Sequence, residues 1–280
     1  MKKILIFGQN GQVASSLIKE FQGDENFQIT SVSSSQADFA KINELKIFLK
    51  NLKENFDFII NSSAYTAVDK AESEEEIADL INHKAVVEIA NFAKETNAIL
   101  IHYSTDYVFD GSGIEPFSED NTQNLNPINI YGKTKLAGEI AIKSSSCKYI
   151  IFRISWVYSK DENHKNFYNT IKKLAKEKEE LTIINDQIGT PTNASDIAKI
   201  TKSTIEKITK GQNFSGIYHI TNEKYISWYD FAVQIVEELK IAGEKLAVKS
   251  IKSIKSQDYK TAAKRPLNSR LKTKINWFCY

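Results

Sequence analysis

The chain has 280 residues, of which 41% are hydrophobic and 26% are charged, and its net charge is +2. This globular composition excludes a disordered chain, and the near-balanced charge lacks the clustered basic excess of a nucleic-acid-binding protein. No run of about 18 apolar residues is present, so no transmembrane helix is expected. The apolar run at 4–7 is cut off by Gly8, so no signal peptide is expected either.

Apolar runs rich in Ile, Val and Phe alternate with helical periodicity up to Arg153. Strands are predicted near 3–7, 28–33, 57–61, 98–103 and 148–154, and helices near 11–21, 41–53, 74–95 and 130–145. Helix 74–95 has its own start signal, because Ser73 can cap it and the glutamates at 74–76 suit the positive end of the helix dipole. Such strands are typical of a parallel sheet covered on both faces, so we predict an α/β, doubly wound, Rossmann-type fold.

The alternation is less regular after Arg153. Weak strands are predicted near 181–184 and 217–220, and helices near 165–178, 194–208 and 228–241. From Lys240 to Tyr280 there are eleven Lys or Arg residues against two acids, Glu244 and Asp258. This basic tail either meets an anionic group such as a diphosphate or forms a solvated surface.

Ligands of a doubly wound sheet bind beyond the carboxyl ends of its strands. Strand 3–7 runs directly into Gly8-Gln9-Asn10-Gly11-Gln12-Val13-Ala14, and a helix follows, so backbone amides there can receive a pyrophosphate. The spacing is Gly-x-x-Gly-x-x-Ala, and a purely structural turn is the alternative.

The second strand ends at 33–35 in three serines, where an NAD enzyme often has an acid. NADPH and NADH both stay open, because no arginine is present there to bind a 2′-phosphate. Asp38 either accepts a hydrogen bond from the adenine amino group or caps the next helix.

Tyr131 and Lys135 lie one helical turn apart and therefore on the same face. An adjacent ammonium should lower the pKa of a tyrosine from about 10 and prepare it as a general acid for a carbonyl oxygen. Thr105, after strand 98–103, supplies a hydroxyl that can polarise the carbonyl or orient the tyrosine, with Ser104 the second choice. A simple Ser/Thr turn at the strand end is the alternative.

These segments resemble the dTDP-4-dehydrorhamnose reductase family, a branch of the extended short-chain dehydrogenases that acts in sugar-nucleotide synthesis. The resemblance spans nearly the whole chain. It rests on GQNGQVA at 8–14, INSSAYTAVDKAE at 60–72, STDYVFDG at 104–111, NIYGKTKLAGE at 129–139, RISWVY at 153–158, DQIGTPT at 186–192 and RPLNSRL at 265–271.

The resemblance implies a reduction in which NADPH or NADH gives hydride to C4 of dTDP-4-dehydro-L-rhamnose and yields dTDP-L-rhamnose, for cell-surface polysaccharide such as lipopolysaccharide. It implies that Thr105, Tyr131 and Lys135 are catalytic, with Lys135 also holding the nicotinamide ribose. Cofactor contacts would come from Gly8, Gln9, Asn10, Gly11, Gln12, Val13, Asp38, Phe39, Ser63, Ala64 and Tyr65. Substrate contacts would come from Val68, Asp106, Tyr107, Trp156, Gly189 and Arg265. Trp156 would offer a flat face to sugar or base, and Arg265 a fork for diphosphate.

The expected organisation is a dinucleotide-binding domain at 1–154, rejoined by about 190–220, and a smaller C-terminal substrate-binding region at 155–189 and 221–280. The two cysteines, Cys147 and Cys279, suit a reducing cytoplasm. Some relatives dimerise through a metal, but no acidic cluster carries over, so no metal is predicted and a homodimer stays open.

Two features depart from the family pattern. Ser62 and Ser63 replace alanines that are more usual after the third strand, and the chain stops at 277–280 where relatives continue into a final helix. The second departure leaves the packing of the substrate region open.

Three other functions of the same fold are alternatives to the reductase. A dehydratase is disfavoured because Asp106 is followed by Tyr107 and not by Glu. An epimerase of a nucleotide-linked keto sugar could use the same tyrosine and lysine with a retained cofactor. A non-enzymatic regulatory subunit, like the partner of methionine adenosyltransferase, would not need the catalytic set.

Overall fold

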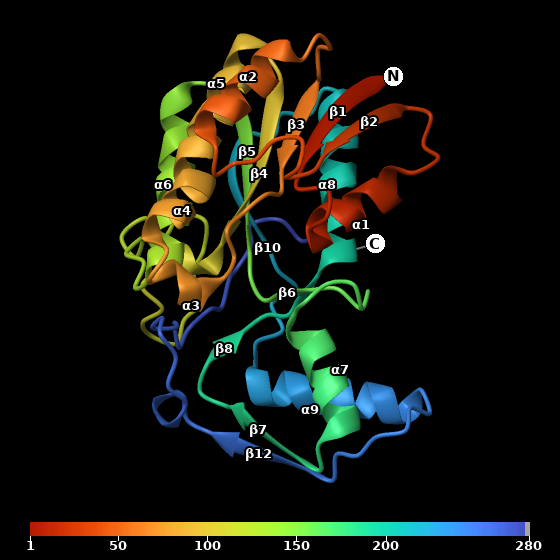
Figure 1. Ribbon diagram of the computed structural model, residues 1–280, viewed down its shortest axis with the longest axis vertical. Helices are drawn as coiled ribbons and strands as arrows, with labels where there is room; N and C mark the ends of the chain where they lie inside the picture. The colour runs from red at the N-terminus through yellow and green to blue at the C-terminus, as the bar shows by residue number, and fades with distance from the viewer. Residues whose placement is uncertain (278–280) are drawn as a thin grey trace.

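A sheet of six parallel strands forms the centre of the protein, whose computed structural model describes residues 1–277 (Figure 1). The strands are β1 (Lys2–Phe7), β2 (Phe27–Val32), β3 (Phe58–Asn61), β4 (Ile99–Thr105), β5 (Lys148–Ile154) and β10 (Gly216–Ile220). Their order is β10-β5-β4-β3-β1-β2. The chain goes from β1 to β2 on one side and then to β3 on the other, so the topological switch point lies between β1 and β3.

Helices cover both faces of this sheet, which is why β1 is apolar along its length. Ile4 and Ile6 pack into one cluster with α1 (Gln12–Phe21) and α8 (Ala194–Thr209). Leu5 and Phe7 point the other way, into a cluster with α2 (Ile42–Asn51) and α5 (Ala85–Glu95), and α6 (Ile130–Ser145) covers the same face. The predicted doubly wound α/β fold is confirmed.

The helix predicted at 74–95 is composite. It consists of α4 (Glu75–Asp79), a π-helical turn at Leu80–Lys84 and α5, and a short α3 (Val68–Ala71) precedes it. The predicted Ser73 cap is wrong, because Glu74 is the N-cap residue and the Ser73 hydroxyl donates to the Lys70 carbonyl instead. The π turn carries Asn82, which is buried and hydrogen-bonds both the backbone of Tyr65 and the hydroxyl of Thr134. The turn thus ties the loop after β3 to α6.

A smaller layer lies beyond the carboxyl ends of the strands (Figure 1). It contains α7 (Phe167–Glu177), β7 (Glu180–Ile184), α9 (Trp228–Ile241) and β12 (Ser250–Ile254), with the short strands β6 (Val157–Tyr158), β8 (Ile188–Gly189), β9 (Thr192–Asn193) and β11 (Ile226–Ser227). The described residues also form two short 3-10 helices, Asp106–Val108 and Ser256–Asp258. The layer has its own apolar cluster, built around residues such as Ile171, Leu181 and Phe231.

The basic tail contains β12, a strand that was not predicted, because its residues are exposed or half-buried and only two of the five, Ile251 and Ile254, are apolar. β12 pairs in parallel with β7. Lys249 and Lys252 form ion pairs with Glu179 and Glu180, each at 2.8 Å. These two lysines of the tail therefore neutralise acids of this chain.

The chain finally returns to the main sheet. Trp277 packs on Phe152 of β5, and its Nε1 donates to the His219 carbonyl of β10 at 2.7 Å. Residues 278–280, including Cys279, lie outside the described residues. Within residues 1–277, no helix combines the length and the apolar character needed to cross a membrane.

Candidate active site

A cavity of about 530 Å³ lies at the carboxyl ends of the parallel strands, between the sheet and the smaller layer. Of the predicted site residues it is lined by Gly11, Gln12, Val13, Ala64, Val68, Thr105, Asp106, Tyr107, Tyr131, Lys135 and Trp156. Gly8, Gln9, Asn10, Asp38, Phe39, Ser63, Tyr65, Gly189 and Arg265 do not line it. The cavity is also lined by residues that were not predicted as site residues. They are Ser62, Thr66, Tyr103, Ile154, Val157, His164, Lys165 and Trp228.

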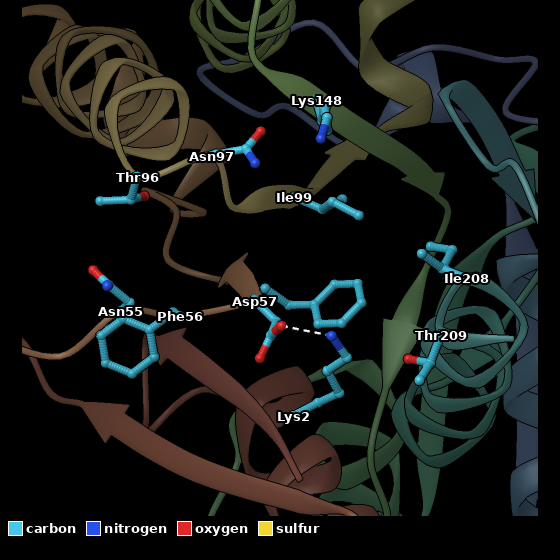
Figure 2. Close-up of a pocket in the computed structure, with 11 residues that line it drawn as sticks. Lys2, Asn55, Phe56, Asp57, Thr96, Asn97, Ile99, Lys148, Ile208 and Thr209 are labelled. Carbon is cyan, nitrogen blue, oxygen red and sulfur yellow. Dashed lines mark hydrogen bonds and ion pairs between the residues drawn. The ribbon is translucent and has the colours of Figure 1, made fainter. Parts of the chain in front are cut away.

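A second hollow, of about 450 Å³, lies at the opposite, amino ends of the strands. Figure 2 shows Lys2 and Asp57 paired at its wall, with 2.7 Å between Nζ and Oδ1. None of the predicted site residues lines this hollow. The candidate active site is therefore the cavity at the carboxyl ends, where a doubly wound sheet binds its ligands.

The glycine turn after β1 fits a phosphate group. Gly8 has φ +90°, and a Cβ there would lie 2.9 Å from Ser63 Oγ and 3.0 Å from Ser63 N, so a side chain has no room. Gly11 is the N-cap of α1 and provides no side-chain cap, so the first-turn amides are not capped by a side chain.

Gln12 connects this turn to the smaller layer. Its Nε2 donates to the Val157 carbonyl at 3.2 Å, and its Oε1 accepts from Asn166 Nδ2 at 3.3 Å. The residue that opens α1 is thus also part of the joint between the two layers.

Asp38 and Phe39 lie away from the cavity, after β2. Asp38 Oδ1 accepts from the Ala40 amide at 3.0 Å, and the N-cap of α2 is Lys41, so Asp38 does not cap that helix. The Phe39 ring packs edge-on against Phe7 in the core, with 5.5 Å between ring centroids. Only the backbone of Phe39 is therefore available to a ligand.

The start of α6 fixes the position of Tyr131. The Asn129 side chain caps the helix by accepting from the Gly132 amide at 2.8 Å and donates to the Lys264 carbonyl at 2.8 Å. A Cβ on Gly132 would lie 2.2 Å from the Tyr107 carbonyl oxygen, so glycine is required for this close approach. Thr105, Tyr131 and Lys135 thereby line one cavity.

The expected effect of Lys135 on Tyr131 is wrong for this structure. Lys135 Nζ donates to the Tyr103 carbonyl at 2.7 Å and lies 3.2 Å from His102 Nε2. The pKa of Tyr131 is raised by burial, with the Thr105 hydroxyl acting in the opposite direction. Burial lowers the pKa of Lys135 to about 8, against the charge of Glu139. Tyr131 is thus protonated at neutral pH, as a proton donor must be.

Asp106 is the buried acid of the cavity, with 3% of its surface exposed. Burial raises its pKa to about 6, although the nearby hydroxyls of Ser269 and Thr105 oppose the shift. The Thr105 hydroxyl donates to Oδ1 at 3.1 Å, whereas Oδ2 has no partner among the described residues. Oδ2 is an acceptor without a protein donor, as a substrate hydroxyl would require.

Arg265 stands next to the cavity behind Tyr107. Its Nη1 donates to the Tyr107 hydroxyl at 3.5 Å, and its Nη2 pairs with Asp69 at 2.6 Å. Tyr65, on the loop after β3, donates its hydroxyl to Glu74, which raises the pKa of Tyr65 to about 12. Arg265 and Tyr65 therefore already have protein partners.

The flat face expected of Trp156 is not available. Trp156 has φ +48° and stacks on Trp228, with 3.5 Å between ring centroids and 9° between planes. A Cβ on Gly189 would lie 2.5 to 2.9 Å from three indole atoms of Trp156, so Gly189 lies against the other face. The prediction of a free stacking face is therefore wrong, although Trp156 still lines the cavity. No local signal in the sequence pairs Trp156 with Trp228.

Within residues 1–277, no group of three or more His, Cys, Asp or Glu side chains is arranged to hold a metal ion.

The switch point, the glycine turn and the Thr-Tyr-Lys set together define an extended short-chain dehydrogenase. Within that class, the family model described as the RmlD substrate binding domain matches residues 1–276, and the chain belongs to this family. The predicted resemblance is confirmed.

Curated relatives extend this assignment. The dTDP-4-dehydrorhamnose reductase of Escherichia coli (strain K12) is 42% identical over 272 residues, which cover 96% of this chain and 89% of the relative. The spore coat polysaccharide biosynthesis protein SpsK of Bacillus subtilis (strain 168) is 34% identical, covering 97% of this chain and 89% of the relative.

Solved structures agree. The dTDP-4-dehydrorhamnose reductase of Bacillus anthracis, solved in complex with NADP, superposes with a TM-score of 0.86 at 33% identity and covers 98% of this chain and 92% of that chain. A UDP-glucose 4-epimerase superposes with a TM-score of 0.74 at 17% identity, covering 90% and 86%, which shows the shared fold.

Proposed function

We propose that the protein reduces the C4 keto group of dTDP-4-dehydro-L-rhamnose to give dTDP-L-rhamnose, with NADPH or NADH as hydride donor. One observation carries the proposal: Thr105, Tyr131 and Lys135 line the same cavity as Gly11, Gln12 and Val13 of the glycine turn. A reductase needs a proton donor beside a nicotinamide site, and this cavity offers both. The family's curated dTDP-4-dehydrorhamnose reductases support the substrate.

The cofactor site would be built from the predicted residues around β1, β2 and β3. The cradle at Gly8, which a Cβ would fill, and the helix start at Gly11 without a side-chain cap fit a diphosphate. The adenosine would lie toward Asp38 and the Phe39 backbone, and the loop at 63–65 would border the nicotinamide half. When bound, the cofactor supplies the hydride.

The chain's own residues supply the proton. Tyr131 holds it on Oη, because burial keeps the phenol neutral, and donates it to the C4 oxygen as that oxygen gains charge. The Thr105 hydroxyl at the end of β4 aligns the same oxygen. Lys135, one helical turn after Tyr131, would bind the nicotinamide ribose and would relay the replacement proton.

The substrate would lie between the sheet and the smaller layer. Val68, Asp106, Tyr107 and Trp156 would contact the sugar, and Gly189 would shape the pocket through Trp156. Arg265 would bind the diphosphate while Asp69 holds its second nitrogen. Residues 1–154 with about 190–220 would thus bind the dinucleotide, and 155–189 with 221–280 the substrate. We place the enzyme in the reducing cytoplasm, which suits the buried free thiol of Cys147.

The test is a coupled measurement of cofactor and product. Purified protein is mixed with dTDP-4-dehydro-L-rhamnose and NADPH or NADH, and the loss of reduced-nicotinamide absorbance is followed while the product is identified by NMR. One dTDP-L-rhamnose formed per cofactor oxidised supports the proposal and ranks the two cofactors. An epimerised keto sugar with no net oxidation would indicate an epimerase, and cofactor binding without turnover of any keto sugar would indicate a regulatory protein.

A further inference from the structure

Behind the catalytic cavity lies a chain of three buried polar side chains to which the sequence analysis gave no role beyond Lys135. Asn61, His102 and Lys135 are at most 1% exposed. Asn61 Nδ2 lies 3.2 Å from His102 Nδ1, and His102 Nε2 lies 3.2 Å from Lys135 Nζ. Each group in such a buried chain needs a donor to face an acceptor, so the positions of the protons can be worked out.

The orientation of the Asn61 amide is set by the backbone. Asn61 Oδ1 accepts from the Ser63 amide at 3.1 Å, which leaves Nδ2 facing His102. An amide nitrogen only donates, so His102 Nδ1 must be an unprotonated acceptor. Burial lowers the pKa of His102 well below its usual value, so the ring is neutral. Its one proton is then on Nε2.

His102 Nε2–H points at Lys135 Nζ, which also donates to the Tyr103 carbonyl at 2.7 Å. An ammonium has three donors and no acceptor, so it cannot accept from Nε2–H, whereas a neutral amine has one lone pair for this bond. We propose that Asn61 and His102 are positioning residues that favour the neutral amine of Lys135 over its ammonium in the ligand-free protein. Within the proposed reductase, Lys135 would thereby pass a proton to Tyr131 more readily.

The opposite state costs a hydrogen bond. A charged Lys135 would donate to His102 Nε2, so the histidine proton would have to be on Nδ1. Nδ1–H would then need an acceptor, and the Asn61 amide would have to turn so that Oδ1 faces His102 in place of Nδ2. The Ser63 amide would then lose its acceptor. Because Ser63 lies against Gly8, the charge on Lys135 is coupled to the loop that borders the glycine turn.

The other charged or titratable groups around Lys135 do not replace this chain. Glu139, one turn further along α6, forms a buried pair with Arg153 of β5 at 2.7 Å, and it favours the charged amine. Tyr131 and Asp106 line the cavity side. Both hydrogen bonds found for Lys135 Nζ among the described residues go to His102 and Tyr103.

The first test measures the tautomer directly in the ligand-free, full-length protein. Long-range ¹⁵N–¹H spectra of ¹⁵N-histidine-labelled protein at pH 9, above the pKa of about 8 of Lys135, distinguish a proton on Nε2 from one on Nδ1. His219 is a built-in reference of the opposite kind, because its Nδ1 donates to the Lys272 carbonyl at 3.0 Å. His102, assigned by its loss in His102→Gln, should carry its proton on Nε2. A proton on Nδ1, or a charged ring, would overturn the proposal whatever the enzyme's substrate.

The second test reverses the chain with Asn61→Asp. The new carboxylate accepts from both Ser63 N and His102 Nδ1–H, so Nε2 becomes an acceptor and favours the ammonium. The pKa of Lys135, followed by ¹³C NMR of [ε-¹³C]lysine-labelled protein, should rise by about one unit or more. The limb of the turnover–pH profile that depends on Lys135 should move with it. An unchanged lysine pKa in a folded Asn61→Asp variant, with Asn61→Ala as the control that removes both groups, would show that the chain is merely structural.

Discussion

Breaking the buried ion pair between Arg153 and Glu139 should destabilise the folded protein strongly. The two side chains are 1% and 2% exposed, and they meet through two hydrogen bonds, of 2.9 Å and 2.7 Å. Glu139→Gln would leave a buried guanidinium without its counter-charge, although the cation still lies 5.0 Å from the centre of the Phe109 ring. Breaking a buried pair in this way costs about 3 to 5 kcal/mol.

The assay for this pair is urea unfolding at pH 7.5, followed by circular dichroism, with the midpoint and slope compared between variants. Glu237→Gln is the matched control, because the Lys240–Glu237 pair has both side chains more than half exposed and should contribute about 0 to 1 kcal/mol. A loss below about 1 kcal/mol for Glu139→Gln, equal to that of the control, would refute the reasoning that this pair is desolvated.

Three further predictions concern the site. Tyr131→Phe should lower turnover by about 10²- to 10⁴-fold while the dissociation constant of NADPH, measured by fluorescence titration, stays within about threefold; near-normal turnover would remove Tyr131 from the mechanism. Gly8→Ala should weaken NADPH binding about tenfold or more, because the new side chain would be strained at φ +90° and would meet Ser63. The control is Gly23→Ala, which is strained at φ +80° but has open space around it, so it should lower stability and leave NADPH affinity intact. Equal NADPH affinities in both variants would contradict the close approach at Gly8. The pKa of Asp106 is raised to about 6 from its usual 3.8. Ionising this buried carboxyl therefore destabilises the folded protein, and this free-energy cost is absent at low pH and grows as the pH rises from about 4 to 6. Asp106→Asn should therefore stabilise the protein against urea by about 2 to 3 kcal/mol at pH 7.5 and by much less at pH 4.5; a gain that does not depend on pH would show that this titration is not its cause.

Much of the central fold could be predicted from the sequence because its strands are buried on both faces. The residues from Ile4 to Phe7 form an uninterrupted apolar run, which is typical of such a strand, and a glycine turn follows it directly. β12 was missed for the opposite reason: its residues are exposed or half-buried, and its one lysine, Lys252, pairs with Glu180 of β7 through a contact that only the tertiary structure creates.

The candidate site was predictable where chemistry depends on local spacing. Thr105, Tyr131 and Lys135 follow from a strand end and one helical turn, and they do line one cavity. Contacts between distant segments were not predictable. The stacking of Trp228 on Trp156 and the bond of Lys135 to the Tyr103 carbonyl both depend on how separate elements pack, and a histidine inside a strand gives no sign that it will meet Lys135.

Gln12 gives the molecule a mechanical link between its two halves. Its side chain is held at both ends by the smaller layer, through Val157 and Asn166, while its backbone begins α1 at the phosphate cradle. The smaller layer cannot turn as a hinged jaw without either breaking these two hydrogen bonds, at about 1 kcal/mol each, or pulling on the first turn of α1. The position of the smaller layer and the geometry of the glycine turn are thus linked through one side chain.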